Sequence, residues 1–165
     1  MTLPHDLDAA SLILITDVAE RARRLAQAAH AGQLDKAGND YFESHLVDVC
    51  RRVVSYGGDT HEQAAAWLHD VVEDTAVTEL DLLASGFSDK TLLMVHLMTK
   101  QEAEDPEVYY ARLRAYEPAR RLKLDADMAS NSDPDRLALL DEVSRARLNA
   151  KYAKGKALLV VDQAS

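Results

Sequence analysis

The spacing of apolar residues restricts this chain to a helical fold more firmly than any other feature of the sequence. Between Ala10 and Ala31, apolar residues recur every three or four positions: Leu12, Ile15, Val18, Ala22, Leu25 and Ala29. This spacing places them on one face of a helix, which predicts one long helix that ends at Gly32. Alternation typical of strands is almost absent, apart from a weak pattern over residues 158–161. We therefore expect an all-α fold of about seven helices.

Capping and turn residues divide the rest of the chain. A second helix is expected from Tyr41 to the glycine pair at 57–58, and a third from Thr60, an N-cap with Gln63 three residues on. The prolines at 106, 118 and 134 each follow an acidic residue, where the first turn of a helix tolerates proline. The last of these helices carries apolar residues that could close the core or meet a second subunit of a homo-oligomer: Leu137, Leu140, Val143 and Leu148.

The composition favours one compact domain. At 165 residues, 47% of them hydrophobic, the chain suits a single domain over residues 1–165. The sequence starts without a basic segment that leads into an apolar stretch, and no apolar run is long enough to cross a bilayer. We therefore expect a cytoplasmic protein with no membrane partner. The formal net charge of −9 argues against an extended nucleic-acid partner but allows a small phosphorylated substrate beside a cation. Cys50 is expected to fill the core.

The run from His69 to Thr75 concentrates the side chains that could carry chemistry. On a helix, residues three and four apart share a face. One helix end should therefore present an imidazole and three carboxylates: His69, Asp70, Glu73 and Asp74. Such carboxylates repel one another unless a cation compensates them, and imidazole with carboxylate suits manganese, iron, magnesium or zinc. The alternative is a helix terminus with a solvated acidic last turn.

The residues from Leu68 to Thr75 read LHDVVEDT, a run that resembles the HD-superfamily hydrolases and, within them, the RelA/SpoT hydrolase branch. Two further segments are similar to that branch. Residues 29–33 (AHAGQ) with the following Lys36, Gly38, Tyr41 and His45 resemble its first loop, and residues 126–131 (ADMASN) resemble its late Ala-Asp segment. The resemblance runs from about Ala29 to Pro134 and implies a compact, all-α HD-domain bundle.

The resemblance also implies site residues. The metal ligands would be His45, His69, Asp70 and Asp127, with Mn²⁺ the usual divalent ion in this branch. Glu73 and Asp74 would orient and deprotonate the attacking water.

Lys36 would hold a phosphate, and Asn131 would contact the nucleoside part of a substrate. Three further basic residues are either outer phosphate contacts or, the interpretation we favour, part of an exposed helix face: Arg120, Arg121 and Lys123.

Two departures from the branch bear on the site. Asp35 stands where the branch typically has an Arg that stacks on guanine, and a carboxylate cannot stack in that way. The Lys-Leu-Ala-Asp segment of the branch is one residue longer here, from Lys123 to Asp127, so either Asp125 or Asp127 could be the fourth ligand. We prefer Asp127 because it keeps the four-residue spacing to Asn131.

These features predict a metal-dependent phosphohydrolase that acts on a nucleotide or a small phosphate ester. The nearest activity by resemblance is that of a guanosine-3′,5′-bis(diphosphate) 3′-pyrophosphohydrolase, which hydrolyses ppGpp. A metal- and nucleotide-binding sensor without turnover is the alternative, and a helical scaffold with an incidental acidic cluster is a third. The presence of both Glu73 and Asp74 favours the enzyme over the sensor.

Overall fold

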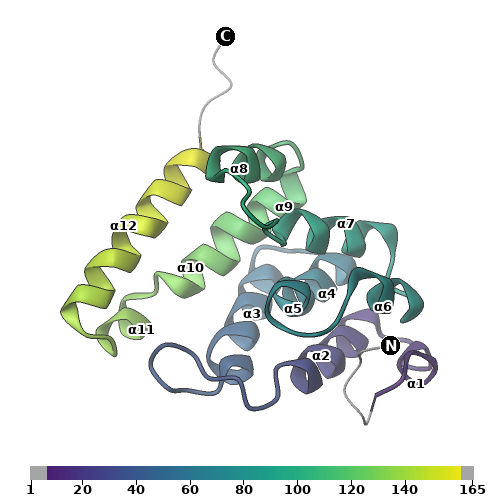
Figure 1. Cartoon of the computed structure of the whole chain (residues 1–165). Coiled ribbons are helices and arrows are strands. Elements are labelled where there is room, and N and C mark those ends of the chain that lie inside the picture. Colours follow the sequence, from purple (N-terminus) through teal and green to yellow (C-terminus); the bar gives the residue numbers. More distant parts are fainter. Residues whose placement is uncertain (1–6, 161–165) are drawn as a thin grey trace.

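The structure of the protein, a computed structural model, describes residues 7–160 and consists of helices and their connections (Figure 1). The first half of the chain contains α1 (Ala9–Ile13), α2 (Val18–Ala29), η1 (Phe42–Leu46), α3 (Val47–Ser55), α4 (Thr60–Leu68), α5 (Val71–Asp74) and α6 (Glu79–Ala84). The second half contains α7 (Asp89–Met98), α8 (Pro106–Arg114), α9 (Glu117–Arg121), η2 (Leu122–Asp127), α10 (Met128–Asn131), α11 (Pro134–Ala138) and α12 (Glu142–Leu159). Within residues 7–160, extended pairing is limited to one isolated bridge between Leu34 and Asp40. The predicted all-α class is confirmed.

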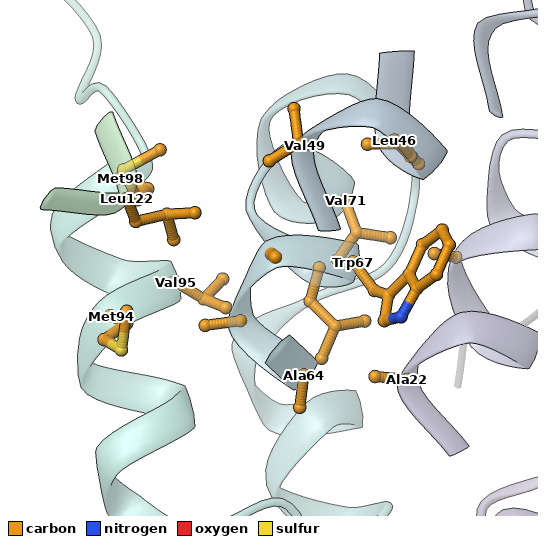
Figure 2. Close-up of a cluster of buried hydrophobic side chains, with 14 of the residues drawn as sticks. Ala22, Leu46, Val49, Ala64, Trp67, Val71, Met94, Val95, Met98 and Leu122 are labelled. Atoms are coloured by element: carbon orange, nitrogen blue, oxygen red, sulfur yellow. The ribbon is translucent and has the colours of Figure 1, made fainter. Parts of the chain in front are cut away.

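Helix α4 forms the centre of the core. Every residue from Ala64 to Leu68 is buried, and the helix packs against α2, α3 and α7. Figure 2 shows Ala64, Trp67 and Val71 between side chains of α2, α3 and α7. The Trp67 ring stacks on Phe42 with ring centroids 5.3 Å apart, and Cys50 is buried as a free thiol in the same cluster. Because His69 directly follows this helix, the core fixes the position of His69 and Asp70, which we call the HD pair.

The long first helix predicted from Ala10 to Ala31 is wrong, because the chain breaks between α1 and α2. Asp17 caps α2 by accepting hydrogen bonds from the N–H groups of residues 19 and 20. The carbonyl groups freed by the break are satisfied by Arg21, which donates to Ile13 and Ile15 and also to the carbonyls of residues 85 and 86. The buried guanidinium of Arg21 thus supplies the hydrogen-bond donors that a continuous helix would have supplied to these carbonyls.

Two other predicted boundaries shift. Helix α4 is capped by Asp59 with Glu62 in a capping box, one residue before the expected Thr60, and the Asp59 carboxylate accepts from two N–H groups of the first turn. The helix expected after Pro134 divides into α11 and α12 because Asp141 starts a new cap. This division leaves Val143 79% exposed, whereas Leu137 and Leu148 are buried.

The last helix, α12, lies at one edge of the molecule, with α1, α2 and α6 at the other (Figure 1). Gly155 brings α12 close to Tyr110 and Met128, since a Cβ added there would overlap the ends of both side chains. The strand pattern at residues 158–161 is wrong for Leu158 and Leu159, which are helical, and Val161 lies outside the described residues. Within residues 7–160, no helix combines the length and apolar character needed to span a membrane.

Candidate active site

The HD pair lies at a break between two helices. Helix α4 ends at Leu68, His69 is its C-cap, and Asp70 has φ −102° and ψ −3° before α5 begins. Two adjacent side chains of a regular helix diverge by about 100°, but this break turns them toward the same point. Nε2 of His69 lies 3.0 Å from Oδ2 of Asp70.

His45 and Asp127 are both carried by π-helical turns, η1 and η2. The N–H of Val47 donates to the carbonyl of Phe42, and the N–H of Met128 donates to the carbonyl of Lys123, both five residues back. A π turn accommodates one extra residue in a helix and is frequent at functional sites. Turn η2 therefore accommodates the additional residue of the Lys123–Asp127 segment.

The four predicted ligands lie together. The ligand atoms of His45, His69 and Asp70 are all within 4.8 Å of one another. Oδ1 of Asp127 lies 3.4 Å from Nε2 of His45 and 3.7 Å from Nε2 of His69. Asp125 is exposed and lies 3.8 Å from Arg121, so Asp127 is the residue that faces the imidazoles.

The two imidazoles fit a metal ion. Nε2 of His45 and Nε2 of His69 are buried without a hydrogen-bond partner. Nδ1 of His69 donates to the carbonyl of Ala66 at 2.8 Å, so Nε2 is the nitrogen that faces the carboxylates and that would bind a metal once it is deprotonated. Burial opposes a charge on His69, but the carboxylates of Asp70 and Asp127 outweigh it and raise the pKa of His69 well above its usual value. The site therefore favours a positive charge at this position.

Neighbouring donors orient the two carboxylates. The hydroxyl of Tyr41 donates to Oδ2 of Asp70. Lys123 donates to Oδ2 of Asp127 at 2.7 Å, and Asn131 donates to Oδ1 at 2.6 Å. The interpretation of Lys123 as part of an exposed face is wrong, because its side chain is 18% exposed and lines the pocket beside Asp127. Helix η2 turns this residue inward, a direction that the sequence pattern did not reveal.

Arg120 and Arg121 lie elsewhere. Arg121 stacks over the ring of Tyr56 at 4.0 Å and donates to its carbonyl. Arg120 lies 3.9 Å from Glu117. Neither arginine lines the pocket described below.

The acidic pair follows at the end of α5. Glu73 is exposed, and its Oε2 accepts a hydrogen bond from the backbone N–H of Lys100 at 2.9 Å. Asp74 accepts a hydrogen bond from Gln33 at 3.3 Å. Burial and then the negative charge of Asp70 raise the pKa of Asp74. Both carboxylates line the same pocket as Asp70 and Asp127.

This pocket has a volume of about 400 Å³. Its basic lining residues are Lys36, Lys123, Arg136 and Lys151, and its apolar and aromatic lining includes Tyr110, Met128, Leu137, Leu140, Leu148 and Tyr152. Burial and then the charges of Lys151 and Arg147 lower the pKa of Lys36. The expected substrate residues Lys36 and Asn131 both line it, so one cavity brings together two of the predicted ligands, Asp70 and Asp127, with the acidic pair and a group of cations.

Asp35 organises the loop at the rim of the pocket. Its Oδ1 accepts hydrogen bonds from the N–H groups of Ala37 and Asn39, both at 2.9 Å. Its Oδ2 lies 3.3 Å from Arg136, which also approaches Nδ1 of His45 at 3.0 Å. Asp35 thus holds Arg136 of α11 at the edge of the pocket.

The sequence interpretation gave no role to Gln33, Tyr41 or Arg136. Tyr41 was visible only as part of the resemblance, and the spacing of Tyr41 to His45 was its one signal. Arg136 lies more than 90 residues from His45 along the chain, and nothing in its local sequence marks it.

The sequence is similar to a known protein family and to several known proteins. A family model described as HD domain matches residues 22–123. A Mycobacterium leprae protein named "Probable GTP pyrophosphokinase" is 36% identical over 83 residues, which are 50% of this chain and 10% of that protein. A Synechocystis sp. protein named "Probable guanosine-3′,5′-bis(diphosphate) 3′-pyrophosphohydrolase" is 38% identical over 80 residues, 48% of this chain and 10% of that protein. The chain thus spans about a tenth of the length of these curated relatives.

The fold is similar to a solved structure described as a metazoan ortholog of SpoT that hydrolyzes ppGpp and plays a role in starvation responses. The TM-score is 0.71 at 20% sequence identity, with 88% of this chain and 87% of the other chain covered. This similarity shows a shared fold. The family model covers more than half of the sequence, including His45, His69 and Asp70, and the protein therefore belongs to the HD domain family.

Proposed function

We propose that this protein is a metal-dependent phosphohydrolase that acts on a nucleotide, with ppGpp as the substrate and manganese as the ion. The observation that carries the proposal is the pair of buried nitrogens, Nε2 of His45 and Nε2 of His69, which lack hydrogen-bond partners and face Asp70 beside a pocket with a cationic lining. A relative named for ppGpp hydrolysis supports the choice of substrate.

His45, His69, Asp70 and Asp127 would hold the ion. Imidazole and carboxylate ligands without thiolate suit manganese. When bound, a divalent cation supplies a Lewis acid that polarises a phosphoryl oxygen and makes water more acidic. Tyr41 keeps the Asp70 carboxylate aimed at the imidazoles.

The acidic pair would serve the attacking water. Asp74 is the better proton acceptor, because burial and the charge of Asp70 raise its pKa and make it more basic than an ordinary aspartate. Glu73 is held by the backbone of Lys100 and would orient the water through its other oxygen. Both carboxylates act at the pocket wall without serving as ligands.

The basic residues of the pocket would bind the substrate's phosphates. Lys36 and Lys151 have no ion-pair partner within 4.0 Å among residues 7–160, so their charges are available to an anion. Asn131 donates one amide N–H to Asp127 and would contact the nucleoside through its other N–H or its amide oxygen. The aromatic rings of Tyr110 and Tyr152 offer apolar faces to a base.

The test is an incubation of the manganese-loaded protein with ppGpp, followed by anion-exchange separation of the products. Hydrolysis at the 3′ position consumes one water and yields GDP and pyrophosphate. We expect both products from the wild-type protein and neither from His69→Ala. GDP, GTP and simple phosphate esters should be included as other substrates. Recovery of bound, intact ppGpp would favour a sensor, and no binding or turnover of any of these compounds would contradict the proposal.

A further inference from the structure

A chain of hydrogen bonds runs from the interior of the protein to the pocket through His30, Gln33 and Asp74. Nδ1 of His30 lies 2.7 Å from Oε1 of Gln33, and Nε2 of Gln33 donates to Oδ2 of Asp74 at 3.3 Å. His30 is the C-cap of α2 and is 1% exposed, whereas Gln33 lines the pocket. The chain therefore connects a buried ring with a carboxylate at the pocket wall.

The chemistry of the three groups fixes the direction of these bonds. An ionised Asp74 only accepts hydrogen bonds, so Gln33 must turn its amide N–H₂ toward it. The amide oxygen then faces His30, and Nδ1 of His30 must carry a proton. Burial lowers the pKa of His30, which leaves the ring neutral with a lone pair on Nε2. Nε2 of His30 is indeed buried without a partner.

The backbone around Gln33 holds the residue in place. Its N–H donates to the carbonyl of His30 and its carbonyl accepts from the N–H of Tyr41, both at 2.9 Å. Gly32, directly before it, has φ +78°, a left-handed conformation that allows the chain to turn back after α2. The side chain of Gln33 therefore leaves the backbone from a fixed point between His30 and Asp74.

We propose that Gln33 is a positioning residue that aims the carboxylate of Asp74, and that His30 fixes the amide orientation in which Gln33 does so. The proposal rests on the proposed function, in which Asp74 accepts a proton. Among residues 7–160, Gln33 is the residue that donates a hydrogen bond to this carboxylate. A neutral amide suits this task, because it orients the carboxylate without adding the positive charge that would make it a weaker base.

The first test compares kcat in three variants. Gln33→Leu should lower kcat roughly tenfold, the lower end of what one hydrogen bond to a charged group contributes, with KM and manganese content unchanged. His30→Phe removes the donor and should lower kcat in the same way. His30→Asn places an amide N–H near the position of Nδ1 and should restore part of the loss. Gln27→Leu, an exposed position on α2, is the control and should keep wild-type kcat.

A double variant separates positioning from general destabilisation. If His30 acts through Gln33, Gln33→Leu combined with His30→Phe should be no slower than Gln33→Leu alone. The proposal would be overturned if the kcat losses of the two single variants multiplied in the double variant, or if Gln33→Leu kept the wild-type kcat.

A second readout does not depend on activity. In metal-free, uniformly ¹⁵N-labelled protein, NMR should show His30 protonated at Nδ1, and Asp74→Asn should shift the side-chain amide signals of Gln33 but not those of Gln27. A proton on Nε2 of His30 would overturn the proposal even in an active enzyme. A wild-type protein that shows these NMR signals without hydrolysing ppGpp would instead count against the proposed function.

Discussion

The hydroxyl of Tyr41 gives a sharp test of how the metal site is supported. It donates to Oδ2 of Asp70, one of the proposed ligands, and its ring packs between His30 and His45 with centroids 5.2 Å from each. Burial and then the charge of Asp70 raise the pKa of Tyr41 far above its usual value. The hydroxyl therefore stays protonated and donates throughout the working pH range.

Tyr41→Phe removes this one hydrogen bond and keeps the ring. A hydrogen bond to a charged group contributes about 1.5–3 kcal/mol, which corresponds to roughly 10- to 100-fold in an equilibrium constant and matches the usual effect of a residue that orients a metal ligand. We expect the affinity for manganese to fall by this factor. The assay is a titration of metal-free protein with manganese against a competing chelator.

Tyr56→Phe is the matched control. The hydroxyl of Tyr56 is also buried, but it has no hydrogen-bond partner within the described residues, so its removal should leave manganese affinity unchanged. Equal affinity in Tyr41→Phe and the wild type would refute the reasoning, as would an equal loss in both variants.

Three further predictions concern the pocket and the core. Burial and the charge of Asp70 raise the pKa of Asp74, so kcat should decline on acidification at a higher pH than an ordinary aspartate would give. The test measures kcat against pH in the wild type and in Asp74→Asn. The same decline at low pH in both proteins would contradict this role of Asp74. Lys36→Ala should raise KM for ppGpp several-fold with little change in kcat, since the charge of Lys36 would bind phosphate in both the ground state and the transition state. Steady-state kinetics measures both constants, and a fall in kcat with an unchanged KM would contradict the prediction. Arg21→Met should lower the free energy of unfolding by about 3 kcal/mol, because it leaves buried and partly buried carbonyls without a hydrogen-bond donor; urea denaturation measures this difference.

The sequence was sufficient for most helix positions because their signals are local. Thr78, Ser88 and Asp105 cap their helices through side-chain bonds to residues two or three positions on. The break before α2 was missed because the apolar spacing continues through it; the capping residue Asp17 was its one local signal, and Arg21 stabilises the break with contacts to residues 85 and 86. Such long-range contacts leave no periodic signal.

The candidate site, like the fold, was only partly predictable from the sequence. His69 and Asp70 stand out because they are adjacent to an acidic pair. The spacing to Asn131 favoured Asp127 over Asp125, and in the structure Asp127 lies 3.4 Å from Nε2 of His45 whereas Asp125 lies beside Arg121. The inward direction of Lys123 depends on the π turn in η2, which sequence periodicity does not reveal. Lys123 and Asn131, which orient Asp127, lie four residues from it, but Tyr41 and Gln33 reach Asp70 and Asp74 from distant parts of the chain, and their contacts required the three-dimensional structure.

The account depends on one ion bound by His45, His69, Asp70 and Asp127, and metal content measures this most directly. Elemental analysis of protein purified without chelator and dialysed against manganese should give roughly one ion per chain. His69→Ala and Asp70→Ala should lose the ion, whereas Glu73→Ala should keep it and lose turnover. A folded His69→Ala protein that still binds one ion per chain, or a wild-type protein that binds none, would contradict the central claim.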